Sequence, residues 1–123
     1  MNIPAEHQTI MPYLILKNAS KFIDFTQNVF GSSETNTKSV REDGTIIHAE
    51  VTLNGSTIMI TDEIEDWAKQ TSHLFVYVPN ADETYKKALE NGAVTLMELS
   101  DKHYGRTCGV TDPFGNVWWI TSL

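Results

Sequence analysis

The sequence has few features that would cross-link the chain or hold it in a membrane. It contains one cysteine, Cys108, so an internal disulfide is excluded. No stretch approaches the roughly 20 apolar residues that a membrane-spanning helix needs. The first ten residues show no basic segment followed by an apolar run, which is the pattern of a signal peptide. We therefore expect a cytoplasmic protein without a membrane partner, in a reducing compartment.

Positive charge is also scarce. The 123 residues include 9 Lys and Arg against 16 Asp and Glu, which gives a formal net charge of −7. Nonspecific nucleic-acid binding needs clustered Lys and Arg, so nucleic acid is not an expected partner. The length suits a single domain or a tightly fused pair of half-domains.

What the sequence does contain is a repeated plan. The stretches "LILKNASKFIDFTQNVFG" and "VYVPNADETYKKALENGA" each read as an apolar strand, Asn-Ala, an amphipathic helix and a glycine. Asn18 and Asn80 are expected to cap these helices, and Gly31 and Gly92 follow their ends. A second pair of similar segments, "NGSTIMITD" and "FGNVWWITS", is separated by nearly the same number of residues as the first pair. Two such pairs in the same order indicate an internal duplication.

Each half therefore predicts one strand, one helix and three more strands. In the first half the expected strands are residues 9–16, 34–40, 45–53 and 57–61, and in the second half 72–78, 95–99, 106–111 and 116–121. The polar segment 62–71 is expected to be a linker with a helical turn. The result is an α+β fold, one domain over residues 1–123, with two four-stranded sheets each backed by a helix.

This plan resembles the vicinal-oxygen-chelate superfamily, which includes glyoxalase I, bleomycin-resistance proteins and extradiol dioxygenases. The resemblance rests on "YLILKNASKFIDFTQNVFG", "HLFVYVPNADETYKKALENGA" and "DPFGNVWWI", while "IIHAEVTLNGSTIMITDE" resembles the branch labelled demethylubiquinone-methyltransferase-like. It implies two βαβββ modules, at about 9–61 and 72–123, whose curled mixed sheets form a cup. It also implies a homodimer, to which Trp67 in the linker could contribute.

Alternation along the strands predicts which side chains face the helices and which face the cup. Trp118 should pack beneath a helix, and its neighbour Trp119 should line the cup. The expected helix-facing set is Leu14, Leu16, Ile58, Ile60, Leu74, Val76, Val78, Trp118 and Ile120. The expected cup-facing set is Met11, Tyr13, Ile15, Thr57, Met59, Thr61, His73, Phe75, Tyr77, Val117, Trp119 and Thr121, joined by His48, Glu50 and Thr52.

The resemblance also implies four metal-ligand positions, one on each of four strands. In this sequence they fall on Met11, Met59, His73 and Trp119, of which only His73 carries a side chain that binds a hard divalent ion. We therefore expect no metal in the inherited place and no cofactor. A soft-metal site at the methionines, or a displaced site built by His73, His48 and Glu50, stays open.

Without a metal, the acid–base candidates are His73, His48 and Glu50. A carboxylate facing an apolar cup should have a raised pKa, which a neighbouring imidazole would lower again. Cys108 is expected to be buried and inert. Segment 100–107 is expected to be a loop that carries Arg106 to the cup mouth, where it could hold a carboxylate or phosphate, or pair with Asp101 or Asp112.

Three functions remain open at this stage. The preferred one is binding of a small, aromatic or planar molecule without turnover. The expected ligand-binding residues are Tyr13, His48, Glu50, Met59, His73, Phe75, Trp119 and Arg106. The alternative is a lyase- or isomerase-type enzyme that moves a proton next to a carbonyl with His73, His48 and Glu50. The third is an interaction module whose cup is closed by side chains.

Overall fold

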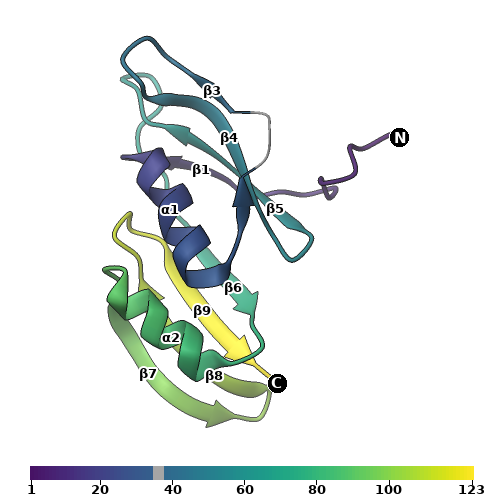
Figure 1. The fold of residues 1–123 in the computed structure, drawn as a ribbon, viewed down its shortest axis with the longest axis vertical. Helices are drawn as coiled ribbons and strands as arrows, with labels where there is room; N and C mark the ends of the chain where they lie inside the picture. The colour runs from purple at the N-terminus through teal and green to yellow at the C-terminus, as the bar shows by residue number, and fades with distance from the viewer. Residues whose placement is uncertain (35–37) are drawn as a thin grey trace. The chain divides into compact units, whose positions relative to one another are not determined.

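The computed structural model describes residues 1–34 and 38–123 and divides the chain into two compact units. The first unit is Met1–Gln27 with Gly31–Gln70, and the second is Asn28–Phe30 with Thr71–Leu123. Each unit has one helix lying across one face of a mixed sheet (Figure 1). The predicted α+β class is therefore confirmed, and the two sheets are open rather than closed into a barrel.

The first unit contains one helix and five strands among the residues described. The elements are β1 (Tyr13–Leu16), α1 (Ala19–Phe30, whose last three residues belong to the second unit), β2 (Ser33–Glu34), β3 (Ser39–Val40), β4 (Ile46–Leu53) and β5 (Ser56–Asp62). The strand order is β1-β5-β4-β2, with β3 also paired to β4. The first and last strands run parallel, and the register puts Met59 opposite both Tyr13 and Glu50.

The second unit repeats this arrangement. Its elements are β6 (His73–Tyr77), α2 (Ala81–Glu90), β7 (Val94–Lys102), β8 (Gly105–Thr111) and β9 (Val117–Ser122). The strand order is β6-β9-β8-β7, and the first and last strands again run parallel. The repeated sequence segments thus form equivalent strands in both units.

The two adjacent tryptophans separate as alternation predicts. Trp118 is almost fully buried, with its ring centroid 4.6 Å from that of Phe30, the last residue of α1. Trp119 lies on the opposite face and is half-buried. Of the predicted helix-facing set, Leu74 and Val78 are half-buried and the others are buried.

Several strand limits differ from the prediction. The first strand begins at Tyr13 rather than residue 9, because Pro12 has no N–H and only accepts, from the Met59 amide at 2.9 Å. In place of the predicted strand 34–40 there are two short strands, β2 at its start and β3 at its end. Residues 35–37 between them lie outside the described residues. The loop expected at 100–107 is wrong: β7 and β8 continue through it and leave only residues 103–104 as the turn.

The segment expected to hold a helical turn is also different. Within 62–71 the chain makes a tight turn closed by two backbone hydrogen bonds between Ile64 and Trp67, at 3.0 and 3.1 Å. Gln70 then exchanges backbone hydrogen bonds with Ile15, which extends the sheet beside β1. The polar composition favoured a helix, but pairing with β1 satisfies the same backbone groups.

Of the two helix caps predicted, the one at Asn80 is confirmed and the one at Asn18 is wrong. Asn80 caps α2, with its side chain accepting from the Glu83 amide at 3.1 Å. Asn18 makes no side-chain cap, because it adopts the left-handed conformation with φ +66°. Instead the buried Asp62 at the end of β5 accepts the first amide of α1, from Ala19, at 2.7 Å. In the second unit the hydroxyl of Ser122, at the end of β9, takes the amide of Ala81 at 3.1 Å.

The buried Asp112 organises the turn before β9. Its carboxylate accepts hydrogen bonds from the Trp118 indole at 2.8 Å, the amides of Phe114 and Asn116 at 2.9 Å each, and the Asn116 side chain at 3.1 Å. Pairing of Asp112 with Arg106, one of the two expected pairings, is therefore wrong, whereas the pairing with Asp101 is present at 3.2 Å.

We predict that Asp112→Ala lowers the free energy of unfolding by about 3 kcal/mol, because it leaves buried N–H donors without a charged acceptor. Urea unfolding followed by far-UV circular dichroism measures this. Asp101→Ala, which removes an exposed carboxylate from the same unit, should change stability little. Equal losses in the two variants would contradict the role given to Asp112.

Candidate functional site

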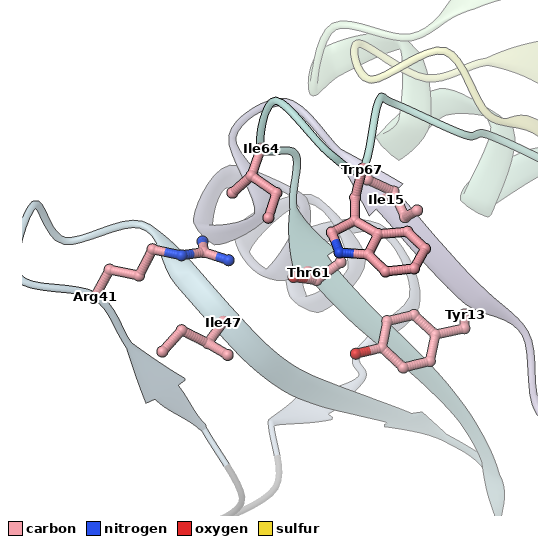
Figure 2. Close-up of a pocket in the computed structure, with 7 residues that line it drawn as sticks. All are labelled: Tyr13, Ile15, Arg41, Ile47, Thr61, Ile64 and Trp67. Carbon is pink, nitrogen blue, oxygen red and sulfur yellow. The ribbon is translucent and has the colours of Figure 1, made fainter.

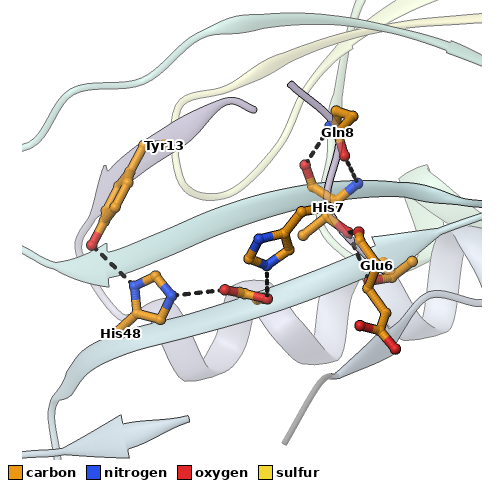
Figure 3. Close-up of polar contacts among 8 residues, drawn as sticks. Glu6, His7, Gln8, Tyr13 and His48 are labelled. Carbon is orange, nitrogen blue, oxygen red and sulfur yellow. Dashed lines mark hydrogen bonds and ion pairs between the residues drawn. The ribbon is translucent and has the colours of Figure 1, made fainter. Parts of the chain in front are cut away.

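The most connected polar group of the first unit is centred on the Glu50 carboxylate. Glu50 is only 3% exposed, yet its two oxygens are bonded to two histidines: Oε1 lies 2.8 Å from Nε2 of His7, and Oε2 lies 3.0 Å from Nε2 of His48. His48 continues the chain of contacts, because its Nδ1 is 3.1 Å from the Tyr13 hydroxyl. Figure 3 shows His7, His48 and Tyr13 on one face of the sheet, with the contact between Tyr13 and His48 as a dashed line.

The direction of these hydrogen bonds follows from the chemistry of the groups. An ionised carboxylate only accepts, so Nε2 of His48 donates to Glu50. In a neutral imidazole the other nitrogen then accepts, and the Tyr13 hydroxyl donates to Nδ1. The Tyr13 proton is thus directed at a histidine that is oriented by a buried carboxylate.

The two histidines keep Glu50 ionised. Burial acts to raise the pKa of Glu50, but the hydrogen bonds from His48 and His7 outweigh it and lower the pKa below its usual range. The expectation that an imidazole lowers this pKa is therefore confirmed, with two imidazoles instead of one.

His7 comes from an N-terminal segment that docks onto the sheet. The Gln8 side chain donates to the Thr57 carbonyl at 2.9 Å and accepts from the Thr57 amide at 3.1 Å. The Thr57 hydroxyl donates to the Glu6 carbonyl. Sequence reasoning missed His7, because the segment before the first strand has no periodicity that would place it against β4.

Beside this network the first unit contains a cavity of about 490 Å³. Tyr13 belongs to both features. The walls are mostly apolar and aromatic, with Arg41 as the charged member; the lining residues are Tyr13, Ile15, Arg41, Ile47, Thr61, Ile64 and Trp67. Figure 2 shows the rings of Trp67 and Tyr13 on one side of this space and the Arg41 guanidinium reaching in from the other.

The cavity is built from three parts of the unit: the turn between Ile64 and Trp67, the paired strands β1 and β5, and the β3–β4 hairpin that carries Arg41 and Ile47. The tight turn between Ile64 and Trp67 carries both side chains to the sheet face. Tyr13, Ile15 and Thr61 come from the paired strands β1 and β5. Of the predicted cup-facing set, these three residues line the cavity, whereas Ile47, Ile64 and Arg41 were not predicted.

In the second unit, the predicted residues lie on the sheet face opposite Trp118. The Trp119 indole donates to Nδ1 of His73 at 3.2 Å, and the two rings stack with centroids 6.0 Å apart. Phe75 is half exposed and contacts Tyr77 and Tyr104, with ring centroids 5.1 and 6.4 Å away. These side chains form an exposed aromatic surface on the second sheet.

The remaining candidates have structural roles. Arg106 makes two hydrogen bonds to Asp82, at 2.7 and 3.1 Å, and one to Asp101, and these bonds raise its pKa. Cys108 is buried, and burial raises the pKa of its thiol to about 11, so the prediction of an inert cysteine is confirmed.

The structure therefore brings together Tyr13, His48 and Glu50, with Met59 as their strand neighbour. It separately brings together His73 and Trp119, with Phe75 beside Trp119 in the register of β6 and β9. The two groups belong to different units. Within residues 1–34 and 38–123, no three His, Cys, Asp or Glu side chains are arranged to hold a metal ion.

Comparison with protein families fits this architecture. Residues 8–120 match the family model described as the glyoxalase/bleomycin resistance protein/dioxygenase superfamily. The chain belongs to this superfamily. No helix among the described residues has the length and apolar character needed to span a membrane.

Several proteins are similar to this one over most of its length. Uncharacterized protein Mb0911c from Mycobacterium bovis is 29% identical over 121 residues, covering 89% of this chain and 79% of its own. The PhnB protein from Bacillus cereus superposes with a TM-score of 0.77 at 24% identity, over 94% of this chain and 100% of its own. TnmS3, an antibiotic-binding protein from Streptomyces sp. CB03234, superposes with a TM-score of 0.70 at 17% identity, over 99% of this chain and 98% of its own.

The lowered pKa of Glu50 predicts a pH-dependent contribution to stability. A carboxyl group whose pKa is lower in the folded state stabilises the fold above its unfolded pKa, near 4.3, and loses this contribution as pH falls through the folded value. Glu50→Gln should lower the free energy of unfolding by about 2 kcal/mol at pH 7, and the difference from the parent should shrink below about pH 4.

Urea titrations between pH 7 and pH 3 measure this difference. Glu65→Gln, which changes an exposed carboxylate in the same unit, is the matched control and should follow the parent chain throughout. A Glu50→Gln difference that stays constant with pH would show that the charge of Glu50 is not what the two histidines stabilise.

Proposed function

We propose that this protein binds a small, aromatic or planar organic molecule in the cavity of its first unit. The observation that carries the proposal is the cavity itself, about 490 Å³, with Tyr13 and Trp67 as aromatic walls. This volume lies in the range of about 300–1,000 Å³ typical of small-molecule sites. Membership of a superfamily that includes bleomycin-resistance proteins supports a binding role, as does the likeness in fold to TnmS3, an antibiotic-binding protein.

Aromatic stacking supplies the affinity in this proposal. Trp67 is 63% exposed and Tyr13 is 51% exposed, so both rings are available to a ligand. A planar molecule stacked against them would bury both rings, and offset or edge-to-face contacts add to the burial of apolar area. None of the predicted residues His73, Phe75, Trp119, Met59 and Arg106 lines this cavity, and all but Met59 belong to the second unit.

The proposal includes no metal at the inherited positions. Met11, Met59 and Trp119 supply thioethers and an indole, which do not fit a hard divalent ion. The remaining residue, His73, already accepts the Trp119 indole N–H at Nδ1. The homodimer and the cytoplasmic location remain predictions.

We predict that Trp67→Ala weakens binding of 2-naphthol, used as a neutral planar probe, by about tenfold or more, because one aromatic wall is lost. Isothermal titration calorimetry measures the affinity. Trp119→Ala, which removes an indole from the second unit, should leave it unchanged. The reverse pattern would move the site to the second sheet, and no binding by the parent chain would reject the proposal.

A second function is favoured by the contact chain from Tyr13 to Glu50. A proton leaving the Tyr13 hydroxyl would pass to Nδ1 of His48, and the imidazolium would be stabilised by the Glu50 carboxylate. The resulting phenolate, at the cavity wall, could take a proton from a carbon next to a ligand carbonyl and leave an enolate. The alternative enzyme predicted from the sequence used His73, His48 and Glu50; in this proposal Tyr13 takes the place of His73, which belongs to the second unit.

This alternative predicts catalysed hydrogen exchange. In deuterium oxide the parent chain should accelerate exchange of the methyl protons of 2-acetylnaphthalene, observed by proton NMR, whereas Tyr13→Phe should lose about 100-fold or more of that rate. Tyr77→Phe, which removes an exposed phenol in the second unit, is the control and should retain the rate. Exchange no faster than in buffer would exclude this activity for aryl ketones and leave the binding role in place.

A further inference from the structure

The charge inside the first-unit cavity is opposite to that of the chain. The protein carries a net charge of −7, yet among the seven residues that line the cavity the formally charged one is Arg41. The rest of the lining is three isoleucines, a threonine and two aromatic residues. A ligand that enters this space therefore meets one cation and, on the described lining, no carboxylate.

The guanidinium of Arg41 is held in place by neutral acceptors. Its Nη1 donates to the Ile46 carbonyl at 3.2 Å and to the Thr45 hydroxyl at 3.3 Å. Within residues 1–34 and 38–123, no carboxylate lies within 4 Å of the guanidinium, and Nη1 alone makes its hydrogen bonds to these residues. A guanidinium has five N–H donors, so Nε and Nη2 are available to a ligand.

The nearby Asp43 acts on Arg41 through its charge but makes no direct ion pair with it. Asp43 directs one carboxylate oxygen at Thr45, accepting from the amide at 2.9 Å and the hydroxyl at 2.7 Å. These hydrogen bonds, and to a smaller extent the charge of Arg41, lower the pKa of Asp43. The backbone of Arg41 is fixed by bonds to Thr45 and Gly44, at 2.8 and 3.0 Å.

The cation and the aromatic walls lie on different sides of the same cavity. Figure 2 shows the Arg41 guanidinium directed across the space toward the rings of Trp67 and Tyr13. A ligand that stacked on Trp67 would extend its far edge toward Arg41. Guanidinium groups bind carboxylates through paired N–H donors, which favours a planar anion over a planar neutral molecule of equal size.

We propose that the ligand of this cavity is a planar aromatic carboxylate, whose ring stacks on Trp67 while its carboxylate binds Arg41. This inference rests on the proposed binding function and adds the charge class of the ligand. It also assigns Arg41 as the residue that selects for the anion.

The test compares two probes of nearly the same size and shape, one anionic and one neutral. The parent chain should bind 2-naphthoate about tenfold more tightly than 2-naphthamide at pH 7, measured by isothermal titration calorimetry. Arg41→Gln should remove this preference and leave 2-naphthamide binding unchanged, whereas Arg41→Lys should retain part of it. Lys17→Gln makes the same charge change at an exposed site of the same unit and should keep the full preference.

Each outcome has a distinct meaning. Equal affinity for the two probes would overturn the inference about charge while the binding function stands. A preference that survives Arg41→Gln would overturn the assignment of Arg41. Binding of neither probe by the folded parent chain would reject the binding function, and the charge inference with it. Circular dichroism of each variant confirms that the comparison is made on folded protein.

Discussion

The site depends on the parallel pairing of the first strand of each unit with its last strand. In the first unit this pairing sets Tyr13 beside Met59, and Met59 in turn beside Glu50, so three residues far apart in sequence share one sheet face. The same strand ends secure the helices, because Asp62 and Ser122 each accept the first amide of the helix in their own unit. A one-residue slip would reverse every face at once.

Electrostatics then divides the first unit into two neighbouring environments. Glu50 is a buried carboxylate, and two imidazoles stabilise it by bonding to it. Arg41 is a cation at the cavity wall whose contacts are neutral among the described residues. Tyr13 joins the two, since its hydroxyl meets His48 while its ring lines the cavity. Ligand binding and proton transfer would therefore share this one residue.

The alternation of side chains along a strand was sufficient to predict their placement where the strand buries one face. It separated Trp118 from Trp119 because period-two exposure follows directly from strand geometry. It failed where the chain leaves regular structure. His7 precedes the first strand, and Trp67 sits in a turn that was expected to be helical. Neither position has a repeating pattern, so only its backbone partners, far away in sequence, decide where its side chain lies.

The sequence by itself determined the duplicated strand and helix plan, the α+β class and the buried faces, because these follow from local periodicity and from turn residues. Only the tertiary structure decided that His7 joins His48 at Glu50, and that Arg41 and Trp67 enclose a cavity with Tyr13. The physical reason is that the contact of His7 with Glu50, and the meeting of Tyr13, Arg41 and Trp67, join residues more than twenty positions apart, where periodicity carries no information about distance.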